Sequence, residues 1–153
     1  MIKVLFICHG NICRSPMAEF IFKDMIQKRG IAQNFYVASC ATSTDELGDS
    51  VYPPAKAVLA RHGISCKGKY AVQLTPQDYD KYDMLIAMDS YNVRNIYRMV
   101  GGDPAKKISK LMDYTPRGGD VDDPWYSGDF EIAYNDIYEG CKSLLDKITS
   151  TRT

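Results

Sequence analysis

Short apolar runs alternate along this chain with segments of helical periodicity, and this alternation constrains the fold more than any other feature. The strand-like runs span 2–7, 35–40, 82–88 and, more weakly, 107–112. Apolar residues recur at helical spacing over 16–29, 53–62, 90–99 and 130–148. Strands that alternate with helices through short connections predict a parallel sheet covered by helices on both faces. Such sheets bind ligands beyond the carboxyl ends of their strands.

Length, charge and cysteine usage exclude several classes of protein. A chain of 153 residues is the size of one compact domain, so we expect a single domain over 1–153. Nineteen basic and nineteen acidic residues balance, which gives no indication of a nucleic-acid or membrane partner. The first apolar run is too short for a signal peptide or a spanning helix, and the five cysteines are unevenly spaced. We therefore expect a cytoplasmic protein with reduced thiols.

The segment "VLFICHGNICRSP" (4–16) joins the first strand-like run to the first helical pattern. It places Cys8 at the end of the strand, and Ser15 followed by a proline predicts a helix start with Ser15 at the N-cap. Gly10 permits backbone angles that other residues avoid, and Asn11 tolerates the left-handed region. The loop is therefore expected to turn its N–H groups inward as an anion-binding nest beneath the helix N-terminus.

Two side chains of this loop point to phosphate chemistry. The guanidinium of Arg14 can bind two phosphate oxygens at once, and the positive field at a helix N-terminus favours the nucleophilic thiolate of Cys8. Taken singly, Cys8 also fits a small buried residue that ends a strand, and Arg14 a surface charge. Together they predict a nucleophile inside a phosphate site. The predicted phosphate-binding loop comprises His9, Gly10, Asn11, Ile12, Cys13, Arg14 and Ser15.

Four motifs of the chain resemble the low-molecular-weight protein tyrosine phosphatases, in family order and over nearly the whole length. They are "VLFICHGNICRSPMAE" at the start, "SCATS" at 39–43, "AMDSYNV" at 87–93 and "DDPWY" at 122–126. The resemblance implies a single-domain, three-layer α/β fold of the flavodoxin-like, phosphotyrosine protein phosphatase I type, with a four-stranded parallel sheet. It also implies metal-independent, cofactor-free hydrolysis of phosphotyrosine in proteins or peptides, and of small aryl phosphates, through a cysteinyl-phosphate on Cys8.

A general acid is needed for the leaving phenolate, and a placed acid typically contributes about 10²- to 10⁴-fold. Our candidate is Asp123, which precedes a proline inside the long polar segment 113–129. By resemblance, Asp123 protonates the leaving oxygen and then activates water. Asp120 and Asp122 are expected to be solvated loop charges.

Aromatic residues directly follow the candidate acid. Trp125 and Tyr126 are expected to wall a cleft for the phosphotyrosine ring, with a core anchor as the alternative role of Trp125.

Further roles are implied by the resemblance alone. Ser15 would donate a hydrogen bond to the thiolate, and Asn11 would hold the loop through side-chain hydrogen bonds to residues such as Ser39. In many relatives a cysteine at the position of Cys13 forms a reversible disulfide with the nucleophile. Packing within the loop is the alternative role of Cys13. The other three cysteines, Cys40, Cys66 and Cys141, are expected to be structural.

Two departures from the family pattern lie beside the predicted cleft. His9 stands where leucine is usual, and it either places a titratable charge at the mouth or points to solvent. Asp45 and Glu46 stand where many members have an aromatic wall, which makes this rim acidic. An acidic rim would grip a phenyl ring less well than an aromatic wall, so it weakens the expected preference for phosphotyrosine over smaller aryl phosphates. It also predicts a preference for neutral or basic sequences around the phosphorylated residue.

Two other functions remain open at this stage. An arsenate reductase on the same fold would need a pair of resolving cysteines near the pocket, and the chain has none between Cys66 and Cys141. A phosphate-binding module would need the donors of the loop but neither Cys8 nor Asp123. The lack of resolving cysteines and the presence of Cys8 together with Asp123 favour hydrolysis over these two functions.

The sequence indicates less about metal binding and oligomeric state. A zinc site built from Cys8, Cys13, His62 and Cys66 has poor ligand spacing, so we expect no metal. Exposed tyrosines at the predicted surface allow a monomer or a weak dimer.

Overall fold

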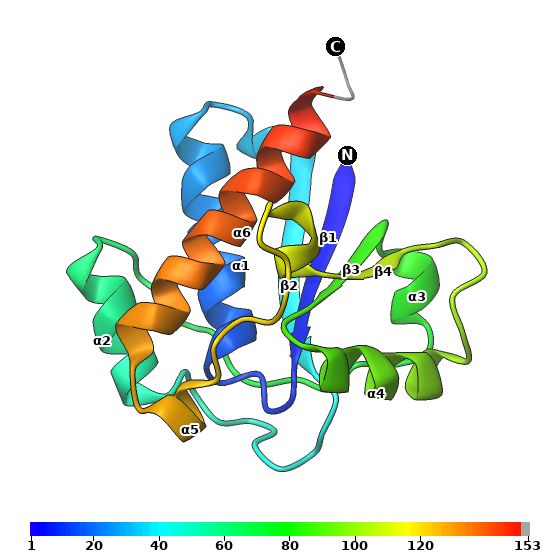
Figure 1. Ribbon diagram of the computed structural model, residues 1–153, viewed down its shortest axis with the longest axis horizontal. Helices are drawn as coiled ribbons and strands as arrows, with labels where there is room; N and C mark the ends of the chain where they lie inside the picture. Colours follow the sequence, from blue (N-terminus) through cyan, green and yellow to red (C-terminus); the bar gives the residue numbers. More distant parts are fainter. Residues whose placement is uncertain (151–153) are drawn as a thin grey trace.

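A four-stranded parallel sheet in the order β2-β1-β3-β4 organises the computed structural model, which describes residues 1–150 (Figure 1). The strands are β1 (Ile2–Cys8), β2 (Phe35–Ala41), β3 (Met84–Ala87) and β4 (Ile108–Lys110). All three neighbouring pairs run parallel, as predicted. The chain passes from β1 to β2 on one side and to β3 on the other, so the strand order reverses at β1. The loop after Cys8 leaves the sheet at this topological switch point.

Helices cover both faces of the sheet. They are α1 (Arg14–Lys28), α2 (Pro53–Arg61), α3 (Asp78–Lys81), α4 (Ser90–Val100), α5 (Pro124–Ser127) and α6 (Phe130–Ser150), with 3₁₀ turns η1 (Ala32–Asn34) and η2 (Leu111–Tyr114). In Figure 1, α1 and α6 lie side by side against one face, and α3 and α4 lie toward the other. No helix within residues 1–150 combines the length and apolar character needed to cross a membrane.

The alternation of side chains along β1 creates two cores. Val4 and Phe6 point into the larger core, which includes buried residues of α1, α2 and α6. Leu5 and Ile7 point to the opposite face, into a smaller core with residues of α3 and α4. A strand that is buried on both faces reads as a continuous apolar run, and this is how β1 appears in the sequence.

Three elements differ from the sequence expectation. The fourth strand covers only Ile108–Lys110, because the side chain of Asp113 accepts the N–H of Lys110 at 2.9 Å and starts a 3₁₀ turn. Helices α3 and α5 were not predicted. Each has four residues, which is too short to show helical periodicity.

Gly140 lets α6 pack closely on η2. A Cβ atom built at this position would lie 2.5 Å from Cγ of Leu111. We expect Gly140→Ala to destabilise the protein, because overpacking costs about 1–3 kcal/mol. This exceeds the roughly 0.5–1 kcal/mol that alanine gains over glycine inside a helix. The free energy of unfolding in urea measures the effect, and the exposed Lys142→Ala on the same helix is the control. A neutral or stabilising Gly140→Ala would contradict the packing argument.

Candidate active site

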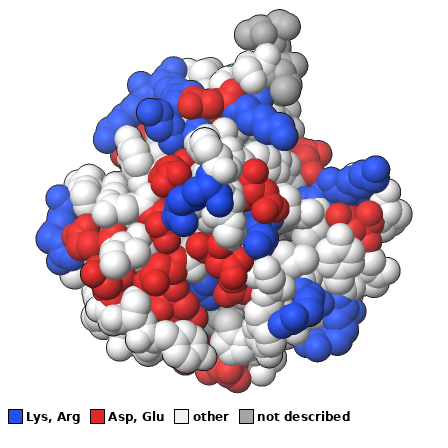
Figure 2. Space-filling model, in the orientation of Figure 1, with Lys and Arg blue, Asp and Glu red and all other residues white. Residues whose placement is uncertain are grey.

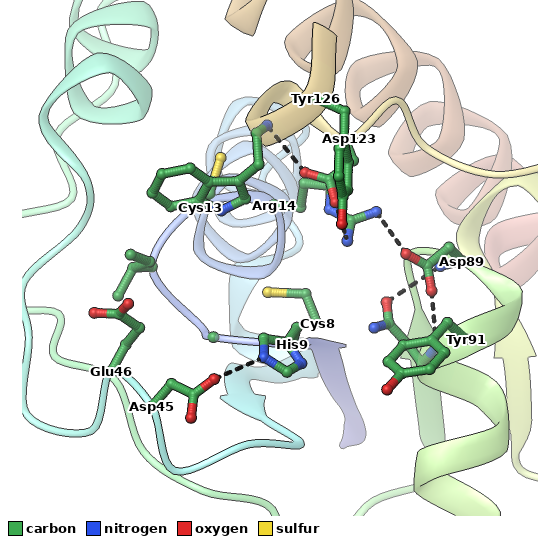
Figure 3. Close-up of a pocket in the computed structure, with 14 residues that line it drawn as sticks. Cys8, His9, Cys13, Arg14, Asp45, Glu46, Asp89, Tyr91, Asp123 and Tyr126 are labelled. Carbon is green, nitrogen blue, oxygen red and sulfur yellow. Dashed lines mark hydrogen bonds and ion pairs between the residues drawn. The ribbon is translucent and has the colours of Figure 1, made fainter. Parts of the chain in front are cut away.

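The loops that follow β1, β2 and β3 meet the segment before α5 around one cleft of about 650 Å³. Figure 3 shows Arg14 near Asp123 and Asp89, with Cys8 facing the open space beneath them. The lining residues are Cys8, His9, Gly10, Ile12, Cys13, Arg14, Asp45, Glu46, Asp89, Tyr91, Asn92, Asp123, Trp125 and Tyr126. All the predicted site residues belong to this set except Asn11 and Ser15, which are buried behind it.

Three polar groups surround the sulfur of Cys8. The backbone N–H groups of Asn11 and Ser15 donate to Sγ at 3.3 and 3.4 Å, and the hydroxyl of Ser15 lies 2.9 Å from it. Cys8 is only 4% exposed, so few water molecules can replace these contacts. The loop thus directs two N–H groups and a hydroxyl at one buried sulfur atom.

Ser15 does not cap the helix, in contrast to the sequence expectation. Helix α1 begins at Arg14, Cys13 occupies the N-cap position, and no side chain makes a capping hydrogen bond. The Ser15 hydroxyl lies instead beside Cys8 and within 3.5 Å of the Cys40 carbonyl oxygen. The hydroxyl that would ordinarily cap the helix N-terminus therefore contacts the sulfur of Cys8 instead.

Asn11 adopts the left-handed conformation expected of it, with φ of 58°. Its side-chain amide donates to Ser15 Oγ at 2.8 Å and to Ser39 Oγ at 2.9 Å, and its carbonyl oxygen accepts the N–H of Val72 at 3.1 Å. Asn11 is 1% exposed. One buried side chain thus ties the loop to α1, to β2 and to the segment near Val72.

The prediction that Gly10 uses unusual backbone angles is wrong, because its φ is not positive. Close approach explains the glycine instead. A Cβ at Gly10 would lie 3.3 Å from Cγ of Glu46, so a larger residue would force the Glu46 side chain to shift slightly.

Arg14 lies between two carboxylates. Its Nη1 lies 2.9 Å from Oδ2 of Asp89, and its Nη2 lies 3.6 Å from Oδ2 of Asp123. Nη1 also donates to the carbonyl oxygen of Val121 at 3.3 Å. Burial is the largest single influence and acts to lower the pKa of Arg14, but the charges of Cys8, Asp123 and Asp89 together raise it. The guanidinium therefore stays charged within the cleft.

Sequence reasoning did not single out Asp89, although it lies in the quoted motif "AMDSYNV". It comes two residues after β3, at the same edge of the sheet as Cys8. As the N-cap of α4, Asp89 also accepts the N–H of Asn92 at 2.7 Å. The signal that could have found Asp89 is its place after a buried parallel strand.

The candidate acid Asp123 is the N-cap of α5. Its Oδ1 accepts the N–H of Trp125 at 3.1 Å. Trp125 is 56% exposed and packs on Tyr52 with ring centroids 4.6 Å apart, so it is a cleft wall and not a core anchor. The N–H of Tyr52 donates to the Ile12 carbonyl at 2.8 Å, which connects this wall to the loop. Tyr126 is 91% exposed at the mouth of the cleft.

All five cysteines are free and buried. Burial, together with the neighbouring charge of Cys8, raises the pKa of Cys13. Burial likewise raises the pKa of Cys40, Cys66 and Cys141. The described residues contain no group of three or more His, Cys, Asp or Glu side chains arranged to hold a metal ion.

A buried polar network that the sequence did not reveal extends behind the loop. Ser39 Oγ donates to Oε1 of Glu19 at 2.6 Å, and Lys23 Nζ lies 2.6 Å from Oε2 of the same carboxylate. Lys69 Nζ donates to the Ser39 carbonyl at 2.8 Å. Since Ser39 also accepts from Asn11, it connects this charged network to the predicted phosphate-binding loop.

We expect Ser39→Ala to lower the free energy of unfolding by about 1–3 kcal/mol, because the Asn11 amide and the Glu19 carboxylate would each lose a buried partner. Denaturant unfolding measures the loss, with the exposed Ser50→Ala as the matched control. An equal effect of the two substitutions would show that the network adds nothing specific.

Comparisons with known proteins agree with this geometry. The family model described as low molecular weight phosphotyrosine protein phosphatase matches residues 3–153. The chain is 40% identical over 150 residues to low molecular weight protein-tyrosine-phosphatase YfkJ of Bacillus subtilis, covering 97% of this chain and 96% of that protein. It is 36% identical over 153 residues to low molecular weight phosphotyrosine protein phosphatase of pig (Sus scrofa), covering 95% of each. The crystal structure of YfkJ superposes with a TM-score of 0.96 at 39% identity, covering 100% of this chain and 98% of that one.

Proposed function

Because this chain belongs to the low molecular weight phosphotyrosine protein phosphatase family, we propose that it hydrolyses phosphotyrosine in proteins or peptides through a cysteinyl-phosphate on Cys8. The relatives it matches are named as phosphatases, which are hydrolases. One observation supports the proposal above all: Cys8, Arg14 and Asp123 line the same cleft at the carboxyl edge of the sheet. A nucleophile, an anion-binding cation and a candidate acid are therefore available to one substrate.

In the first step of the proposed reaction, Cys8 Sγ attacks phosphorus. The S–P bond forms as the bond from phosphorus to the phenolic oxygen breaks. The Arg14 guanidinium and the N–H groups of the loop hold the other phosphoryl oxygens, so charge that develops there meets fixed donors. Protonated Asp123 gives its proton to the leaving oxygen, and tyrosine departs neutral.

In the second step, the Asp123 carboxylate takes a proton from a water molecule as the water oxygen attacks phosphorus. The S–P bond breaks, and inorganic phosphate leaves with the water oxygen. Cys8 returns as a thiolate, stabilised by the hydroxyl of Ser15 and two N–H groups. The cycle needs no redox change and no further reactant besides water.

The two alternatives receive less support. Reduction of arsenate would need thiols that can reach the Cys8 adduct, and among the described residues only Cys13 shares the cleft with it. A module that only binds phosphate would not need an acid beside the anion site, whereas Asp123 lies 3.6 Å from the arginine.

Metal-independent hydrolysis of phenyl phosphate and p-nitrophenyl phosphate, with a chelator present, tests the proposed roles. We expect Cys8→Ser to abolish turnover and Asp123→Asn to lower kcat by about 10²- to 10⁴-fold. The loss in Asp123→Asn should be larger for phenyl phosphate, whose leaving group needs the proton more. Asp120→Asn is the matched control, because Asp120 lies in the same segment but pairs with Lys110 outside the cleft.

Two results would contradict these roles. Phosphate binding by the native protein without turnover would leave only a binding function. Equal losses in Asp120→Asn and Asp123→Asn would mean that the acid is not Asp123.

The role of Ser15 can be separated from loop structure by rapid-quench kinetics. We expect Ser15→Ala to slow breakdown of the phosphoenzyme by about 10- to 100-fold, since a hydrogen bond to a charged group contributes about 1.5–3 kcal/mol. Formation of the phosphoenzyme should change less, so the intermediate accumulates and a burst of phenol becomes visible. Equal slowing of both steps would instead indicate a distorted loop.

A further inference from the structure

The wall of the cleft formed by His9, Asp45 and Glu46 has no role in the proposed chemistry. Figure 3 shows His9 and Asp45 on the opposite side of the cleft from Asp123 and Tyr126. His9 Nε2 lies 3.0 Å from Oδ2 of Asp45, and the two side chains are 50% and 66% exposed. This hydrogen-bonded polar pair stands at the mouth, where a peptide carrying the phosphorylated residue must pass.

Backbone contacts hold this wall at a set distance from the nucleophile. The N–H of Thr42 donates to the Cys8 carbonyl and the N–H of Ser43 to the His9 carbonyl, both at 3.0 Å. The Ser43 hydroxyl in turn accepts the N–H of Asp45 at 3.3 Å. A side chain next to a bound phosphotyrosine would therefore meet Asp45 in a reproducible position.

The charges of the cleft are unevenly compensated. Among the described lining residues, Arg14 is the only lysine or arginine, and it lies between Asp89 and Asp123. That leaves His9 as the only basic partner for Asp45 and Glu46 within the lining.

The rim also carries negative charge from outside the lining. A side-chain hydrogen bond with Asp49 is the main cause that raises the pKa of Glu46, and the charges of Asp49 and Asp45 add to it. Acidic side chains also gather over α5 and the start of α6, on the face seen in Figure 2, but they lie across the cleft from this rim, and Glu131 there is paired with Arg61. A cation brought by the substrate would relieve this excess.

We propose that Asp45 and Glu46 determine substrate specificity by binding a lysine or arginine that lies next to the phosphotyrosine in the substrate. This inference rests on the proposed function, because the phosphoryl group anchored at Cys8 brings the flanking residue to the rim. His9 competes with the substrate cation for Asp45. The rim adds discrimination between substrates without taking part in bond making.

The test uses two phosphotyrosine peptides that differ only in carrying lysine or glutamate at the positions flanking the phosphotyrosine. At low ionic strength we expect kcat/KM to favour the lysine peptide by about 3- to 10-fold, as exposed ion pairs at a fixed site allow. The preference should shrink at high salt, since the charges are exposed to solvent. Hydrolysis of p-nitrophenyl phosphate, which has no flanking residues, gives the baseline for each variant.

Three variants sharpen the test. The double substitution Asp45→Asn with Glu46→Gln should bring the ratio of the two peptides close to one. His9→Leu should increase the ratio, because the competing partner of Asp45 is gone. Asp80→Asn, which removes an exposed carboxylate on α3 away from the cleft, should leave the ratio unchanged.

The outcomes separate this inference from the proposed function. If neither the aryl phosphate nor a peptide is hydrolysed, the proposed function fails. If both are hydrolysed but the native protein shows no preference, or the rim substitutions leave the preference intact, the specificity inference fails alone. An equal change in Asp80→Asn would trace the preference to overall charge and would also overturn it.

Discussion

The side chain of Asn11 holds the phosphate-binding loop in the shape on which the whole site depends. A loop of this length must turn sharply to bring Cys8 and Arg14 together, and the turn places Asn11 at a φ of 58°, where few residues other than glycine are comfortable. The buried side-chain amide of Asn11 donates two hydrogen bonds and accepts a third, and these offset the strain. In the same conformation the N–H of Asn11 points at the sulfur of Cys8. The same backbone conformation therefore closes the loop and directs an N–H group at the sulfur of Cys8.

Arg14 imposes a second constraint, because a buried guanidinium must find anionic partners. Its two carboxylate contacts are unequal: Asp89 lies at 2.9 Å and Asp123 at 3.6 Å. Both carboxylates also cap helices, but Asp89 caps a helix of 11 residues and Asp123 one of only four. In the proposed reaction, the unequal binding of Asp89 and Asp123 to Arg14 suits their different roles. A firmly bound carboxylate orients the arginine, and a loosely bound one is free to exchange a proton with the substrate.

The sequence predicted the parts of the molecule that depend on local pattern. The sheet and the longer helices follow from apolar periodicity. The run from Cys8 to Arg14 predicts a phosphate site through its residue types and its place between strand and helix, and the structure places both residues in one cleft. The contacts that the sequence did not reveal join residues far apart in the chain. The pairing of Arg14 with Asp89, and of Ser39 with Glu19, arises only when separate strands and helices pack together.

Ser15 shows a different reason for failure. Its sequence context favours a helix cap, and that local preference lost to a neighbour that only the fold supplies, the sulfur of Cys8. Gly10 is a second case in which a distant residue accounts for a local feature of the sequence. Its value lies in the space it leaves for Glu46, a residue 36 positions further along the chain, and no local rule for turns reports such a contact.

The two departures from the family pattern, at His9 and at Asp45 with Glu46, lie on one wall of the cleft. The fold explains why this wall can vary while the chemistry stays the same. The segment that carries Asp45 and Glu46 is attached to the loop through the backbone N–H groups of Thr42 and Ser43, which almost any residue can provide. The side chains that contact Cys8 and Arg14, such as Ser15 and Asp89, lie outside this segment. Under the proposed function, a change in rim charge would therefore alter which phosphopeptides are preferred without disturbing the atoms that break the phosphate ester.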